Sequence, residues 1–138
     1  VNADLVIALK VDIYKNEKAN GVATYYYGRD GAGVHSVVGE RFANLIQREI
    51  CARTDLLNCR THGKSWDLLK LTTAPTVRLD LGYLSNPQDA KRLGSPAFRD
   101  QLAEAMIVAI QRLYLSSDDD AKTGTLRISD LRRAGLRN

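Results

Sequence analysis

The sequence has 138 residues, 44% of them hydrophobic, and these values fit one globular domain. No apolar run approaches the ~20 residues that span a bilayer, and no secretory leader is recognisable, so we expect no transmembrane segment. The formal net charge is +4. It comes from the end of the chain, where five basic residues follow Asp120 against Asp130 alone, and the neutral body excludes a broad nucleic-acid-binding surface.

The first half of the chain predicts two strands and a helix. Ala3–Val11 is an apolar run of strand length, which predicts a strand buried on both faces, with Lys10 as the anomaly. Gly21–Tyr27 is rich in β-forming residues and predicts a second strand. Ser36 is a suitable N-cap for an amphipathic helix whose apolar positions recur from Val37 to Ile50.

The second half predicts a linker, a strand and two helices. Residues 58–65 are expected to be a linker, and Thr76–Leu81 a buried strand. Asn86-Pro87 and Ser95-Pro96 each combine an N-cap with proline in the first helical turn. Strands alternating with long helices predict an α/β sheet covered on both sides, in a domain of residues 1–115. Residues 116–138 are predicted to be a polar, basic, flexible tail with weak helical periodicity in residues 128–136.

Two segments carry a family resemblance. ADLVIALKVD resembles the motif ADLxxSIHAN, and PTVRLDLGYLSNPQDAKRL resembles PAVLVELGFLSNPxDAxxL. Both motifs belong to the zinc N-acetylmuramoyl-L-alanine amidases of the amidase-3 type, and the match covers Ala3 to about Leu113. The resemblance implies a parallel or mixed sheet flanked by helices, with the N-terminal part of the domain absent from this chain. Within the family, the chain is most similar to the actinobacterial, catalytically degenerate regulators of peptidoglycan synthesis.

The resemblance also locates the family's active site. Active members hold zinc with His, Glu and His and use a further Glu as general base; two of these ligands precede Val1. The third ligand falls on Lys10, whose ammonium has no lone pair for a metal. The general base falls on Asp80, whose shorter side chain retreats by about 1 Å, enough to cost on the order of a hundredfold in rate. We therefore expect an inactive site in which Lys10 replaces the zinc charge and pairs with Asp80.

Several other residues are candidates for binding or regulation. Arg78 shares a side of its strand with Asp80, which predicts either a basic pocket for an anionic ligand or a second salt-bridge partner. Thr123 and Thr125 lie in the polar tail and are candidate phosphorylation sites. A functional role for His62 is not expected, and Cys51 and Cys59 are interpreted as ordinary thiols, with one local bridge as the alternative.

These observations predict a cytoplasmic, catalytically inactive, amidase-like regulator of peptidoglycan synthesis that needs no cofactor. Its expected partner is a protein of peptidoglycan precursor synthesis or export, with a muropeptide or nucleotide-sugar as a further ligand. Two alternatives remain open. The first is a zinc-dependent amidase with weak activity, and the second is a non-catalytic peptidoglycan-binding module in the cell envelope.

Overall fold

The computed structural model describes residues 2–28, 36–70 and 74–115. The elements in chain order are β1 (Val6–Asp12), β2 (Val22–Tyr27), α1 (Val37–Arg53), β3 (Asn58–Lys64), α2 (Asp67–Lys70), β4 (Thr76–Tyr83), α3 (Pro87–Leu93) and α4 (Pro96–Leu113). None of the helices in these ranges is both long and apolar enough to cross a membrane. The predicted tail, residues 116–138, lies outside the described residues.

The four strands form one mixed sheet in the order β1-β4-β2-β3. β1 is parallel to β4, β2 is parallel to β3, and β2 and β4 are antiparallel at the centre. The mixed α/β sheet predicted from the sequence is thus confirmed. β3 was missed, because its sequence Asn58–Lys64 is polar and lacks the alternation of apolar residues that marks a half-buried strand.

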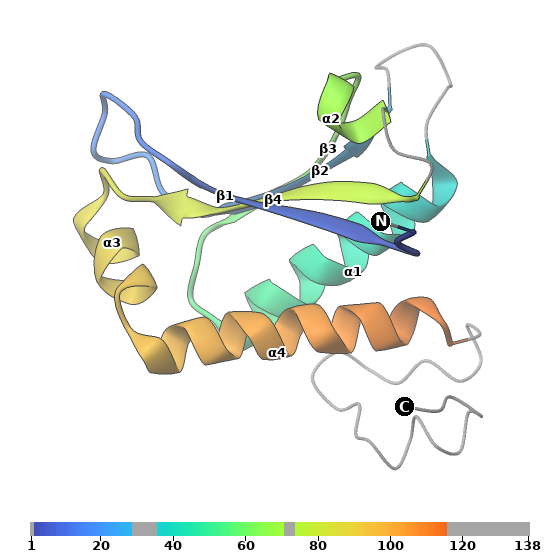
Figure 1. Cartoon of the computed structure of the whole chain (residues 1–138). Coiled ribbons are helices and arrows are strands. Elements are labelled where there is room, and N and C mark those ends of the chain that lie inside the picture. The colour runs from blue at the N-terminus through green and yellow to red at the C-terminus, as the bar shows by residue number, and fades with distance from the viewer. Residues whose placement is uncertain (1, 29–35, 71–73, 116–138) are drawn as a thin grey trace.

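Both long helices cover the same face of the sheet, and of the helices that the structure describes only the short α2 lies over the other face (Figure 1). Leu79 of β4 and Val22 of β2 are fully buried beneath Phe42 of α1 and Leu102 of α4. The expectation of a sheet flanked by helices is confirmed, but the two faces are covered unequally, because both long helices lie on one of them. Alternation of helices and strands along the chain does not by itself decide which face each helix covers.

β1 is an edge strand among the described residues, and the prediction that it is buried on both faces was wrong. Leu9 is 58% exposed, and the side chain of Lys10 is 49% exposed. A continuous apolar run allows burial on both faces, but β1 pairs only with β4 along one of its edges. Lys10 therefore needs no buried partner to be tolerated in this strand.

A buried ion pair joins the two long helices. Arg112 of α4 and Glu49 of α1 are both fully buried, with Nε and Oε1 2.7 Å apart, and Arg53 also contacts Glu49. At the other end of α1, the Arg41 guanidinium donates to the carbonyl oxygens of Leu113 and Arg112 at 2.5 and 3.2 Å. These charge-assisted contacts fix α1 against the last turn of α4.

The segment after β4 ties three parts of the fold together. Ser36, Asn86 and Ser95 are N-caps as predicted. Asp89, which follows Asn86, is fully buried, and its carboxylate accepts hydrogen bonds from the backbone N–H groups of Gly21 and Tyr83 at 2.9 and 3.1 Å. The residues after Asn86 thus anchor the end of β4 to the start of β2, which holds the polar face of the sheet in register.

Candidate functional site

The site is built on the sheet face away from α1 and α4. Because side chains alternate along a strand, burial of Val77 and Leu79 in the core places Arg78 and Asp80 on this opposite face. Strand register then aligns two rows of residues across the sheet. One row is Ala8, Arg78, Tyr25 and His62, and the other is Lys10, Asp80 and Ala23.

Arg78 and Asp80 form a two-point ion pair at the centre of this face. Arg78 Nε lies 2.9 Å from Asp80 Oδ1, and Arg78 Nη2 lies 3.1 Å from Asp80 Oδ2. The two side chains are only 20% and 8% exposed. A guanidinium that meets both oxygens of a carboxylate in a shielded place forms a strong and geometrically specific pair. Both carboxylate oxygens of Asp80 are thus engaged.

Two aromatic rings hold the Arg78 guanidinium in this position. Its Cζ lies 4.0 Å from the ring centroid of Trp66 and 5.1 Å from that of Tyr25. The Tyr25 and Trp66 centroids are 4.8 Å apart, so the three groups form one compact cluster. Stacking on an aromatic face favours arginine electrostatically. Arg78 is therefore restrained from two sides, by Asp80 and by the rings.

Lys10 forms an ion pair with Asp12, so the predicted pairing of Lys10 with Asp80 was wrong. Its Nζ lies 3.2 Å from Asp12 Oδ1, two residues further along the same face of β1. Lys10 and Asp80 are register partners across β1 and β4, as the family resemblance implied, but Asp80 is engaged by Arg78. Asp12 was missed, although its spacing of two from Lys10 and its place at the Asn of SIHAN were visible in the sequence.

The two carboxyl groups interact with each other, which affects their titration. Burial raises the pKa of Asp80, the guanidinium of Arg78 opposes this shift, and a hydrogen bond with Asp12 adds to it. Burial also raises the pKa of Tyr25, with a contribution from the negative charge of Asp80. Lys10, Asp12, Asp80 and Arg78 thus form a charge-balanced chain of two cations and two carboxyl groups.

Comparison with known proteins identifies the family of the chain. The sequence model of Amidase_3, N-acetylmuramoyl-L-alanine amidase, matches residues 1–112. The chain belongs to the Amidase_3 family. It is 45% identical to the N-acetylmuramoyl-L-alanine amidase CwlM of Mycobacterium tuberculosis over 95% of this chain and 32% of that protein. It is 30% identical to the germination-specific N-acetylmuramoyl-L-alanine amidase of Bacillus subtilis over 85% of this chain and 47% of that one.

Solved amidase structures share the fold. The CwlD amidase of Clostridioides difficile, determined in complex with the GerS lipoprotein, superposes with a TM-score of 0.70 at 24% identity, over 81% of this chain and 55% of that one. The catalytic domain of CwlV from Bacillus (Paenibacillus) polymyxa gives 0.68 at 23% identity, over 79% and 56%. The chain spans about a third to a half of the two curated relatives. It spans just over half of these amidase structures.

The residues at the Amidase_3 site positions do not fit a zinc ion. Lys10 stands where the family motif has His, and its ammonium donates to Asp12. Both oxygens of Asp80 are occupied by Arg78. Within residues 2–28, 36–70 and 74–115, no three His, Cys, Asp or Glu side chains gather closely enough to hold a metal ion. The described part of the site therefore lacks a lone-pair ligand at position 10, and its carboxylate at position 80 is already paired with a guanidinium.

The remaining candidates lie away from this chain of charges or outside the described residues. His62 is exposed in β3, and its Nε2 lies 2.7 Å from the carbonyl oxygen of Cys59. Cys51 and Cys59 are free thiols, and burial raises the pKa of both. Both are therefore ordinary thiols, as expected, and the alternative of one local bridge is not formed. Thr123 and Thr125 lie outside the described residues.

Proposed function

We propose that this chain belongs to a catalytically inactive, amidase-like protein that regulates peptidoglycan synthesis by binding a protein or a precursor. The observation that carries the proposal is the two-point pairing of Arg78 with Asp80. The family uses the residue at position 80 as its general base, and a general base must reach a proton on the attacking water. A carboxylate with both oxygens held by a guanidinium does not have that access.

The neighbouring changes support the same proposal. Lys10 brings a positive charge to the place of a neutral metal ligand, and Asp12 supplies the carboxylate that balances it. Trp66 and Tyr25 restrain Arg78 against Asp80. The two positive charges of Lys10 and Arg78 are thus balanced by the carboxyl groups of Asp12 and Asp80. Such compensation preserves the folded sheet while the chemistry is lost.

Regulation is proposed to act through the polar end of the chain. Thr123 and Thr125 carry hydroxyl groups in a segment that follows an acidic run and precedes several arginines. A phosphate on either residue would add negative charge and acceptors for an arginine-lined partner. The proposed partner is a cytoplasmic protein of peptidoglycan precursor synthesis or export. Because the chain is shorter than its curated relatives, this proposal concerns the full-length protein.

A second candidate is a peptidoglycan-binding module without catalysis. The observation that favours it is the aromatic cluster on the same sheet face, where Tyr25 lies 4.8 Å from Trp66 and 5.5 Å from the exposed His62. Aromatic rings on an open face suit stacking on sugar rings or bases. The cluster is therefore compatible with a muropeptide or a nucleotide-sugar as ligand. A residual zinc-dependent amidase is the third candidate, favoured by membership of the family.

Activity of the full-length protein on purified peptidoglycan separates these candidates. The assay measures new N-terminal alanine with added zinc, and the comparison is a variant that restores the family residues, Lys10→His, Asp12→Asn, Arg78→Leu and Asp80→Glu. The regulator proposal expects no release by the wild type and no saturable binding to the polymer. Saturable binding without release supports the module, and chelator-sensitive release by the wild type overturns the inactive site.

A further inference from the structure

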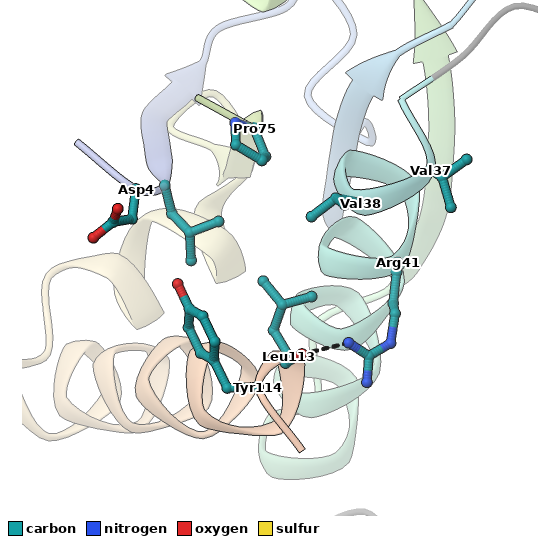
Figure 2. A pocket seen from close by; sticks show the side chains of 8 residues that line it. Asp4, Val37, Val38, Arg41, Pro75, Leu113 and Tyr114 are labelled. Atoms are coloured by element: carbon teal, nitrogen blue, oxygen red, sulfur yellow. Dashed lines mark hydrogen bonds between the residues drawn. The ribbon is translucent and has the colours of Figure 1, made fainter. Parts of the chain in front are cut away.

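A groove of about 710 Å³ lies beside the start of α1 and the end of α4. Its apolar lining includes Leu5. Figure 2 shows the other apolar side chains of the walls: Val37, Val38, Pro75, Leu113 and Tyr114. Asp4 stands at its rim, and Arg41 is turned to the Leu113 carbonyl oxygen. A groove of this size and composition is typical of a binding surface.

The apolar stripe of α1 continues into this groove without being covered. Phe42 and Ile46 of the stripe are fully buried, whereas Val37 is 71% and Val38 is 45% exposed. Tyr114, at the end of α4, is 55% exposed on the facing wall. Large apolar side chains gathered in one concave place indicate an interaction site more strongly than the same residues scattered singly.

We propose that this groove binds residues 128–136 of the same chain. The first argument is connection. α4 ends at Leu113, which lines the groove, so the chain continues from the groove itself. The twelve residues 116–127 can extend over roughly 40 Å, which is ample to return to the groove. A short covalent connection also gives an effective concentration on the order of millimolar, so weak apolar contacts suffice.

The second argument is the match between segment and groove. Ile128, Leu131 and Leu136 are spaced so that a helix would place them on one face. Arg132 falls in the middle of that face, and Asp4 has no ion-pair partner among the described residues. An arginine brought to the rim by the apolar contacts would meet this carboxylate, which favours this segment as the occupant.

Amide hydrogen exchange of residues 128–136 in the whole chain tests the proposal. The expected result is exchange at least about tenfold slower than that of an unstructured peptide of the same sequence. Val38→Asp should abolish this protection. Because Val38 is remote in sequence, its replacement cannot change the intrinsic exchange rates of the segment. Val38 is also partly exposed in the first turn of α1, where an acidic residue is compatible with the helix.

Two matched controls make the result specific. Ile107→Asp places the same charge at an apolar, 55% exposed residue of α4 outside the groove, and it should leave the protection unchanged. The protection should also be unchanged on fiftyfold dilution. Three outcomes would overturn the proposal: unprotected exchange in the wild type, equal effects of the two substitutions, or loss of protection on dilution, which would assign the groove to a second copy.

Discussion

The two faces of the central sheet use the same strands for different purposes. Towards α1 and α4, β4 presents Val77 and Leu79 to an apolar core. Towards the other side, the alternating residues Arg78 and Asp80 join a network of charges and rings. Stability is therefore concentrated on the helix-covered face, and the charged residues Arg78 and Asp80 lie on the other face. A fold does not by itself determine the chemistry of the residues mounted on it.

The largest expected effect is a loss of stability when the buried ion pair between α1 and α4 is broken. Arg112→Met leaves the buried Glu49 with Arg53 as its ion-pair partner among the described residues, and loss of one partner of a buried pair costs about 3–5 kcal/mol. Urea denaturation measures this loss. Replacing both partners, with Glu49→Leu added to Arg112→Met, should recover most of it. A single variant as stable as the wild type would contradict a structural role for the pair.

The next effect contrasts neighbouring residues of β4. Leu79→Ala removes a fully buried side chain from the core, and we expect a cost of roughly 3 kcal/mol in the free energy of unfolding. The variant should retain the fluorescence spectrum of Trp66, because that ring lies on the other face. A changed Trp66 spectrum in Leu79→Ala would mean that the two faces are not independent.

The pH dependence of the free energy of unfolding tests the Arg78–Asp80 pair on the polar face, separately from the core. The pKa of Asp80 is raised in the folded state, so the native protein binds more protons than the unfolded chain above pH 3.8. The contribution of Asp80 to stability is thus greatest below that pH and is lost as pH rises through its folded pKa. Arg78→Leu removes an opposing charge and should steepen this loss. Asp80→Asn should flatten it, as measured by denaturation from pH 3.5 to 7.

The smallest expected effect is spectroscopic. Trp66 is the single tryptophan of the chain, and its ring lies 4.0 Å from the Arg78 guanidinium. Arg78→Leu should change the emission of Trp66, whereas Arg99→Leu, at an exposed position of α4, should not. Equal spectra for wild type and Arg78→Leu would contradict the stacking of Arg78 on this ring.

Apolar periodicity and capping residues predicted much of this fold. α1 and α4 carry long apolar stripes, and Ser36, Asn86 and Ser95 fix three helix starts, so these features depend on local sequence. β3 was not predictable in this way, because a polar edge strand is stabilised by its pairing with β2. Exposure of β1 was likewise set by its place at the sheet edge.

The site was predictable in position but not in its contacts. The family motifs located Lys10 and Asp80, and period two placed Arg78 beside Asp80. The choice of partners depended on Asp12, which competes for Lys10, and on Trp66, which stacks on Arg78 from beyond β3. Trp66 is far from Lys10 in the sequence and reaches the site only through the order of the strands in the sheet.

Zinc content is the most direct test of the central claim that Arg78 and Lys10 have closed the metal site. Elemental analysis should be made on the freshly purified full-length protein and on the variant with Lys10→His, Asp12→Asn, Arg78→Leu and Asp80→Glu. The account predicts no zinc in the wild type and near-stoichiometric zinc in the variant. Stoichiometric zinc in the wild type would contradict the account and would support a zinc-dependent amidase.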